Sequence, residues 1–237
     1  MESLNHDNWN LIIQDVNLNT RLTSIWENHP FEERLFSPMY PEKINSNSIL
    51  FLGLNPSVSG KPKIDNKPTS WYMDFNTSFE KSCDKPHRHF EKFFQLKDLI
   101  SNKTKESFSY SYMDLLYWQE TNSKKVKEKI DTSFIIEQAK LSVEIISKLK
   151  PRLVIVSNSL AGEILYKHRV PINFIAELKS EVYQFERIPL IIDQSKFMGS
   201  AKLWNAKKGT GVGLKIKLLE EIQKILQKTE DWSNPKQ

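Results

Sequence analysis

Four short apolar runs restrict the possible fold of this sequence more than any other feature. The first spans 48–54 and the third spans 153–156, and both are continuously apolar rather than alternating. Such runs are typical of central strands in a parallel sheet, because both faces of those strands are buried. We predict a second strand within 108–118 that ends near Asp114, and a fourth at 190–192, the second of two runs that a proline separates.

Segments with helical spacing of apolar residues lie between and around these runs. The spacing predicts an N-terminal helix or broken pair at 8–28 and helices at 86–100, 130–150, 159–166 and 212–228. Strands that alternate with amphipathic helices indicate an α/β protein, with three α/β/α layers and a central, mainly parallel four-stranded sheet. We therefore expect an N-terminal helical extension at 1–47, packed on an α/β domain at 48–228, and a loose tail at 229–237.

The composition bears on the size of the hydrophobic core and on the cellular compartment. Hydrophobic residues make up 39% of the chain, which suffices for a substantial core, and no apolar run approaches membrane-spanning length. Cys83 is the single cysteine, so no intrachain disulfide can form, and the first residues carry no secretory signal pattern. We expect a cytoplasmic protein with no membrane partner, and we expect a monomer.

Lysines are concentrated in two places. Six lysines and no acidic residue lie between Gln194 and Leu219, and a second basic run occupies 124–129. With a net charge of +5, this distribution favours a long polyanion over a small ligand as the partner. Solvated surface loops would produce the same clusters without any partner.

Polar residues follow each predicted strand, and they locate a site. Asn55 and Ser57 follow the first strand, Asp114 ends the second, Asn158 follows the third, and Ser195 lies just beyond the fourth. In α/β sheets, ligands bind in the crevice beyond the carboxyl ends of the strands. We therefore expect these residues near one edge of the sheet, although their position alone does not specify a chemistry.

Two of these strand ends carry motifs of a known family. Residues 53–57 are Gly-Leu-Asn-Pro-Ser, and residues 150–156, Lys-Pro-Arg-Leu-Val-Ile-Val, are followed by Asn158 and Ala161. The ordered set resembles the uracil-DNA glycosylase superfamily, most closely its mismatch-specific form, over roughly 49–226. The resemblance implies a uracil-DNA glycosylase-like fold and a hydrolase of base excision repair, which removes a damaged or mismatched base from DNA by breaking its N-glycosidic bond.

The resemblance also implies roles for individual residues. Asn55 would position the water that attacks the sugar, and because an amide is not a base near neutral pH, catalysis would depend on positioning and electrostatics. The residues that would line the base pocket are Leu54, Pro56, Ser57, Trp71, Tyr72, Asp114 and Asn158. Asn-Pro is equally a common turn sequence, and burial in the core is the commoner fate of aromatic residues.

Asp114 departs from the family pattern. The family usually places an asparagine here, whose amide recognises a pyrimidine edge, whereas a carboxylate accepts hydrogen bonds and donates only when protonated. Asp114 would therefore favour a base edge that presents an N–H or amino donor, and uracil is in doubt as the substrate. Alternatively, Asp114 caps a turn or pairs with a nearby lysine.

The second motif of the family, often His-Pro-Ser, has neither histidine nor proline in this chain. The residues that would contact the nucleic-acid backbone or enter the duplex are Ser195, Lys196, Phe197, Met198, Gly199, Ser200 and Lys202. A serine here would hold a phosphate, and Phe197 or Met198 would either wedge into the duplex or pack under the loop. Loss of the histidine removes the group expected to stabilise the leaving base.

Three functions therefore stay open on the sequence. The first is a DNA base glycosylase, the second a non-catalytic module that binds nucleic acid or a nucleobase, and the third a nucleoside or nucleotide hydrolase. RNA is a less favoured polymer than DNA. We expect no cofactor and no metal, because Cys83, His87 and His89 are loosely spaced and have no fourth ligand nearby.

Overall fold

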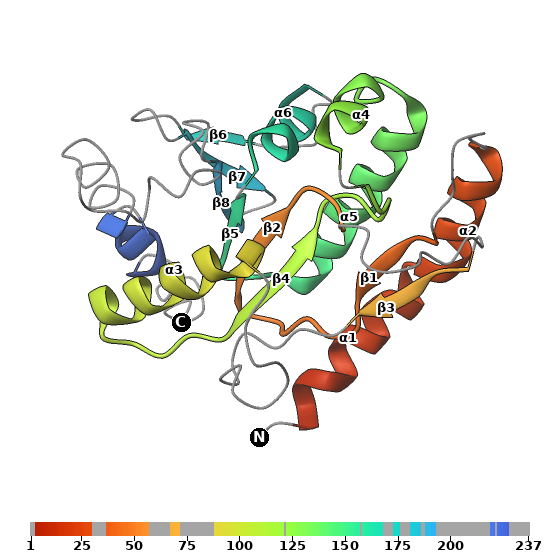
Figure 1. Ribbon diagram of the computed structural model, residues 1–237. Helices are drawn as coiled ribbons and strands as arrows, with labels where there is room; N and C mark the ends of the chain where they lie inside the picture. The colour runs from red at the N-terminus through yellow and green to blue at the C-terminus, as the bar shows by residue number, and fades with distance from the viewer. Residues whose placement is uncertain are drawn as a thin grey trace.

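The computed structural model describes residues 3–29, 37–56, 67–71, 88–120, 122–156, 158–167, 173–175, 181–185, 188–192, 219–220 and 222–227 (Figure 1). The helices are α1 (Ser3–Asp15), α2 (Leu18–Asn28), α3 (Arg88–Thr104), α4 (Ser123–Glu128), α5 (Ser133–Leu149) and α6 (Ser159–Lys167), and residues 219–220 and 222–227 are also helical. The strands are β1 (Met39–Pro41), β2 (Ile49–Gly53), β3 (Thr69–Trp71), β4 (Tyr110–Asp114), β5 (Leu153–Val156), β6 (Asn173–Ile175), β7 (Glu181–Phe185) and β8 (Ile188–Ile192).

A mixed six-stranded sheet in the order β4-β2-β5-β8-β7-β6 forms the centre of the fold (Figure 1). β4, β2, β5 and β8 pair in parallel, with Ile49 opposite both Tyr110 and Leu153. β7 and β6 extend this sheet in antiparallel fashion beyond β8. β1 and β3 form a separate two-stranded parallel sheet. The expectation of an α/β protein with parallel pairing is confirmed.

The prediction that the central sheet has four strands is wrong, because the sheet has six. The two apolar runs near Pro189 are neighbouring antiparallel strands of one sheet, and β6 adds a further strand beyond them. Only two residues separate Phe185 from Ile188, and a connection this short can join antiparallel strands but not parallel ones. Pro189 lies inside β8, one position before the register with β5 begins at Leu190.

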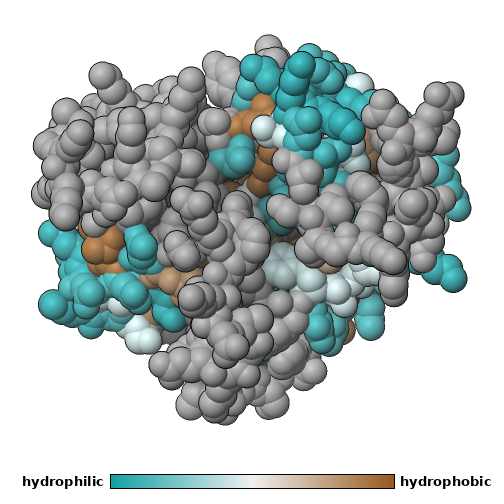
Figure 2. All heavy atoms as spheres, in the orientation of Figure 1, coloured by the Kyte–Doolittle hydropathy of each residue, from teal (hydrophilic) through white to brown (hydrophobic). Residues whose placement is uncertain are grey.

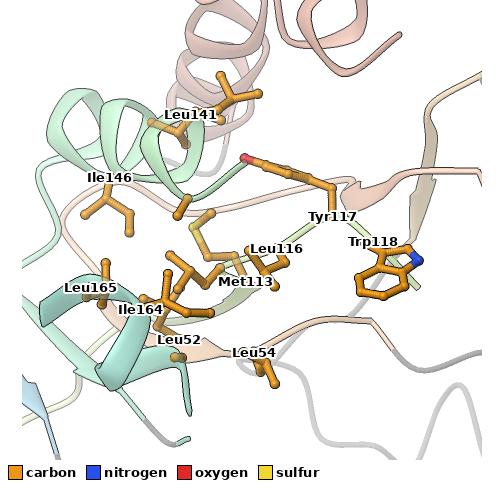
Figure 3. Close-up of a cluster of buried hydrophobic side chains, with 14 of the residues drawn as sticks. Leu52, Leu54, Met113, Leu116, Tyr117, Trp118, Leu141, Ile146, Ile164 and Leu165 are labelled. Atoms are coloured by element: carbon orange, nitrogen blue, oxygen red, sulfur yellow. The ribbon is translucent and has the colours of Figure 1, made fainter. Parts of the chain in front are cut away.

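Alternate residues of the parallel strands face two separate hydrophobic clusters, so helices cover both faces of the sheet. Leu50 and Leu52 belong to a cluster that includes residues of α1, α2, α5 and α6, here called the α5-side cluster (Figure 3). Ile49 and Phe51 belong to a cluster with residues of α3 and 222–227, here called the α3-side cluster. Burial on both sides explains why the first and third apolar runs do not alternate.

The N-terminal segment is a broken pair of helices, one of the two patterns expected there. The break falls at Asn17, which has a left-handed φ of 52°, and asparagine adopts this conformation more readily than most residues. Trp9 and Trp26 are fully buried in the α5-side cluster. The two helices therefore pack on the same core as the central strands.

Side-chain amides hold the buried segment that follows β4. Gln138 of α5 is fully buried, and its Oε1 accepts hydrogen bonds from the backbone N–H groups of Tyr117 (2.9 Å) and Trp118 (3.0 Å). The Nε2 of Gln138 donates to the Phe134 carbonyl at 2.9 Å, and Gln119 Nε2 donates to a carbonyl of the segment before β1. Buried backbone N–H groups need such partners, so Gln138 of α5 fixes the course of the backbone at residues 117 and 118.

We predict that Gln138→Leu lowers the free energy of unfolding by on the order of 3 kcal/mol. The change keeps an apolar side chain of similar size, but it leaves two buried backbone N–H groups without acceptors, at about 1–3 kcal/mol each. Equilibrium urea unfolding measures the loss. Lys140→Leu, at an exposed position of the same helix, is the control and should change stability by about 0.5 kcal/mol or less. Equal losses in the two variants would contradict this role of Gln138.

Candidate functional site

The candidate site lies at the carboxyl ends of β2, β4 and β5. Among the described residues, the first helix after β2 is α3, on one face of the sheet, whereas the first helix after β5 is α6, on the opposite face. Adjacent parallel strands whose connections leave toward opposite faces form the crevice in which α/β proteins bind ligands. Asn55 and Asn158 each lie two residues beyond these strands, and Asp114 is the last residue of β4. The topology therefore brings these three predicted residues to one edge.

Gly53 makes room for a buried tyrosine–carboxylate pair. Gly53 lies opposite Asp114 in the parallel ladder. The Tyr112 hydroxyl donates a 2.7 Å hydrogen bond to Asp114 Oδ1, and both side chains are buried. A Cβ atom at position 53 would lie 2.0 Å from the Tyr112 hydroxyl oxygen and 2.2 Å from Asp114 Oδ1. The pair therefore occupies the space that a side chain at position 53 would fill.

Tyr112 packs among aromatic rings, and its hydroxyl stays protonated and donates the hydrogen bond to Asp114. The rings of Trp71, Phe90 and Phe93 lie edge-on to Tyr112, with centroids 5.8, 5.2 and 5.3 Å away. Burial, then the negative charge of Asp114, then the hydrogen bond to that carboxylate raise the pKa of Tyr112 well above its ordinary value. The hydroxyl therefore stays protonated, and Asp114 acts as the acceptor.

Backbone carbonyls orient the side-chain amide of Asn55. Its Nδ2 donates to the carbonyls of Trp118 (3.2 Å) and Glu120 (2.5 Å), and it lies 3.1 Å from the Pro56 carbonyl. Because carbonyls only accept, the NH₂ group must face them, and Oδ1 must point the other way. Asn55 is half-buried, and no residue within the described ranges donates a hydrogen bond to Oδ1.

With these hydrogen bonds, Asn55 can both stabilise the turn and bind a water molecule. The bonds from Nδ2 tie the turn after β2 to the segment after β4, as expected of a turn asparagine. The same bonds hold Oδ1 in one direction, where it can accept a hydrogen bond from a water molecule. An amide oxygen does not remove a proton from water near neutral pH, so the geometry suits positioning rather than general base catalysis.

The backbone carbonyls of Leu54 and Pro56 accept hydrogen bonds that join the end of β2 to the segment after β4. Leu54 is 6% exposed and its side chain belongs to the α5-side cluster (Figure 3). The Leu54 carbonyl accepts a hydrogen bond from Leu116 N–H at 2.8 Å, and the Pro56 carbonyl accepts one from Glu120 N–H at 3.0 Å. Leu54 can therefore face a ligand with its backbone but not with its side chain.

Trp71 and Asn158 each have structural contacts at this end of the sheet. Trp71 is half-buried against Tyr112, and its buried Nε1 has no acceptor among the described residues. Asn158 Oδ1 caps α6 by accepting hydrogen bonds from the N–H groups of Leu160 (2.8 Å) and Ala161 (3.3 Å). A ligand would therefore meet the NH₂ group of Asn158 rather than its oxygen.

The remaining predicted site residues lie outside the described ranges. They are Ser57, Tyr72, Ser195, Lys196, Phe197, Met198, Gly199, Ser200 and Lys202. Within the described ranges, no group of three His, Cys, Asp or Glu side chains has the arrangement to hold a metal ion. In the same part of the chain, every helix is too short or too polar to cross a membrane.

Two residues that no motif indicates complete the site. Tyr112 lies two positions before Asp114, and the period-two geometry of a strand places both side chains on the face that Gly53 leaves open. Glu120 accepts from Asn55 through its carbonyl, its side chain is 11% exposed, and its Oε1 accepts from Asn122 N–H at 2.9 Å. The strand spacing was a usable signal for Tyr112, whereas Glu120 depends on two distant segments that meet only in the fold.

We predict that Gly53→Ala lowers the free energy of unfolding by about 1–3 kcal/mol, the usual cost of forcing a methyl group into a packed site. The new Cβ would clash with the Tyr112 hydroxyl and Asp114 Oδ1. Equilibrium urea unfolding measures the change in stability.

Tyr112→Phe serves as the control, because it removes the hydroxyl that lies nearest to the added Cβ. The double variant should therefore lose less stability than the sum of the two single variants, as expected for residues in contact. Strict additivity would show that residues 53 and 112 do not constrain each other.

No protein-family model matches this sequence, and a search of curated proteins finds no match for it. A functional assignment therefore depends on the geometry at the carboxyl ends of β2, β4 and β5.

Proposed function

We propose that this protein is a uracil-DNA glycosylase-like hydrolase that excises a damaged or mismatched base from DNA. Support comes from the parallel strands β4, β2, β5 and β8, from the family-like motifs at 53–57 and 150–156, and from Asn55 and Asp114 at the carboxyl edge. Breaking an N-glycosidic bond requires an unstacked base in a pocket, a positioned water, and stabilisation of the charge that develops on sugar and base.

The fixed orientation of the Asn55 amide carries this proposal. A water molecule that donates one O–H to Oδ1 keeps a lone pair available for the sugar carbon at the glycosidic bond. Attack by the water oxygen forms the new C–O bond, and the base leaves with the electron pair of the C–N bond. The water proton passes to solvent, since the amide does not accept it. The contribution of Asn55 is then placement, which is sensitive to errors of about 1 Å.

Asp114 would select the base. Asp114 accepts a hydrogen bond from Tyr112 at Oδ1, and an ionised carboxylate can only accept hydrogen bonds. An acceptor at this position favours a base edge with an amino group or ring N–H. Uracil is a poorer fit, because its ring N–H lies between carbonyl oxygens that a carboxylate repels.

Incubation with oligonucleotides, followed by alkaline cleavage, tests the reaction. The substrates carry uracil, mismatched thymine, hypoxanthine or an alkylated base, and wild-type protein should produce abasic sites from at least one of them. We predict that Asn55→Ala lowers the single-turnover rate by about 100-fold, the usual effect of losing placement of a reacting group.

Gln119→Ala is a matched control, because it also removes a side-chain amide that donates to a backbone carbonyl, here that of buried Ser37 in the segment before β1. It should lower stability comparably but leave the cleavage rate near that of wild type. If Asn55→Ala cleaves as fast as wild type, the role given to Asn55 is wrong. If no substrate yields abasic sites, the enzyme proposal itself fails.

A non-catalytic nucleic-acid or nucleobase-binding module on the same fold is the second candidate. The sequence from Asp193 to Lys202 contains no histidine, which is the group expected to stabilise a leaving base in the family. For such a module, binding to plain DNA would weaken with added salt, and no base would be released.

A further inference from the structure

α4 displays a group of lysines close to the candidate site. Its short sequence contains Lys124, Lys125 and Lys127, and Lys129 follows at the C-cap. The side chain of Lys124 is 83% exposed, and Lys127 is also exposed. The pairing of Lys124 with Glu128 spans 3.9 Å between exposed groups and contributes little, and Lys127 has no ion pair within the described ranges. Both ammonium groups are therefore available to an external anion.

Hydrogen bonds connect this helix to Asn55. Asn55 Nδ2 donates to the Glu120 carbonyl, and Glu120 Oε1 accepts from the backbone N–H of Asn122. Asn122 then caps α4 by accepting from Lys124 N–H at 3.0 Å. The position of the lysines relative to the candidate site is therefore set by three consecutive hydrogen bonds.

The buried side of α4 determines which way the lysines face. Val126 is fully buried in the α5-side cluster, so the opposite side of the helix is turned to solvent. Lys124 and Lys127 are three residues apart and therefore neighbours on the helix surface. In Figure 2, hydrophilic residues cover the top of the molecule, where Figure 1 places α4 and α6 beside the carboxyl edge of the sheet.

We propose that Lys124 and Lys127 of α4 bind the phosphate backbone of the nucleic acid whose base enters the site at Asn55 and Asp114. This inference rests on the proposed function, because it needs a nucleic acid at the carboxyl edge. Lysines act as point charges toward phosphate and release condensed counterions from the polymer. The contact is independent of base sequence, and the hydrogen bonds between α4 and Asn55 set the register between a backbone phosphate and the water site.

The test compares two charge-neutralised variants of the full chain. Lys124→Gln/Lys127→Gln removes the proposed contacts. Lys103→Gln/Lys105→Gln is the matched control, because both lysines are exposed and lie in the last turn of α3 and just after it, ahead of β4, at the opposite, amino edge of the sheet. Both variants lose the same charge, and thermal unfolding checks that both remain folded. Binding to a plain DNA duplex and to its separated strand is measured over a range of salt concentrations.

We expect the α4 variant to bind the duplex more weakly and to reduce the slope of log K against log salt by about 1.8, since each lost phosphate contact contributes about 0.9. The control variant should keep the wild-type slope. A wild-type slope in both variants would overturn the role of α4 and leave the proposed function standing. Equal reductions in both variants would also overturn it, because they would reflect net charge alone. Absence of nucleic-acid binding by the wild type would reject the proposed function together with this inference.

Discussion

The hydrogen bonds between the end of β2 and the segment after β4 determine the shape of the carboxyl edge around Asn55. Carbonyls of residues 53, 54 and 56 accept from the N–H groups of Leu115 (3.1 Å), Leu116 (2.8 Å) and Glu120 (3.0 Å). The pairing of the two strands therefore continues past the regular ladder into the polar turn. Because buried backbone groups must be paired, the turn at Asn55 has little freedom to adopt another course.

Support for the turn comes from the helical layer as well as from the sheet. Gln138 of α5 holds the backbone of Tyr117 and Trp118, and the Trp118 carbonyl is in turn one of the acceptors for Asn55. The position of α5 therefore influences the position of the Asn55 amide through one intermediate segment, residues 117–118. The packed core, rather than the loop itself, therefore holds the side chains of this site in place.

Local sequence pattern predicted the parts of this fold that depend on local chemistry. Continuous apolar runs located β2 and β5, because full burial leaves no reason for alternation. The pattern failed for the hairpin of β7 and β8, where pairing depends on a short connection rather than on composition. It also failed to indicate α4, because one buried valine among lysines gives no helical period.

In the candidate site, too, the sequence predicted some residues and missed others. The position of Asp114 at a strand end followed from its place after an apolar run, and Asn55 was marked by its motif. The partners of these residues could not be predicted by the same means. The Tyr112 hydroxyl lies over Gly53 only because β2 and β4 pair in one register, and Asn55 meets Glu120 only because two chain segments converge.

Gly53, Tyr112 and Asp114 consequently constrain one another, so a change at one position favours changes at the others. A lineage that acquired a side chain at position 53 would first have to lose the tyrosine hydroxyl and move the carboxylate. A lineage that shortened Tyr112 would remove its hydrogen bond to Asp114 and would open a gap above the glycine. Homologous sequences should therefore show these three positions changing together or not at all, and this covariation would identify relatives that share the pocket even where the flanking motifs have diverged.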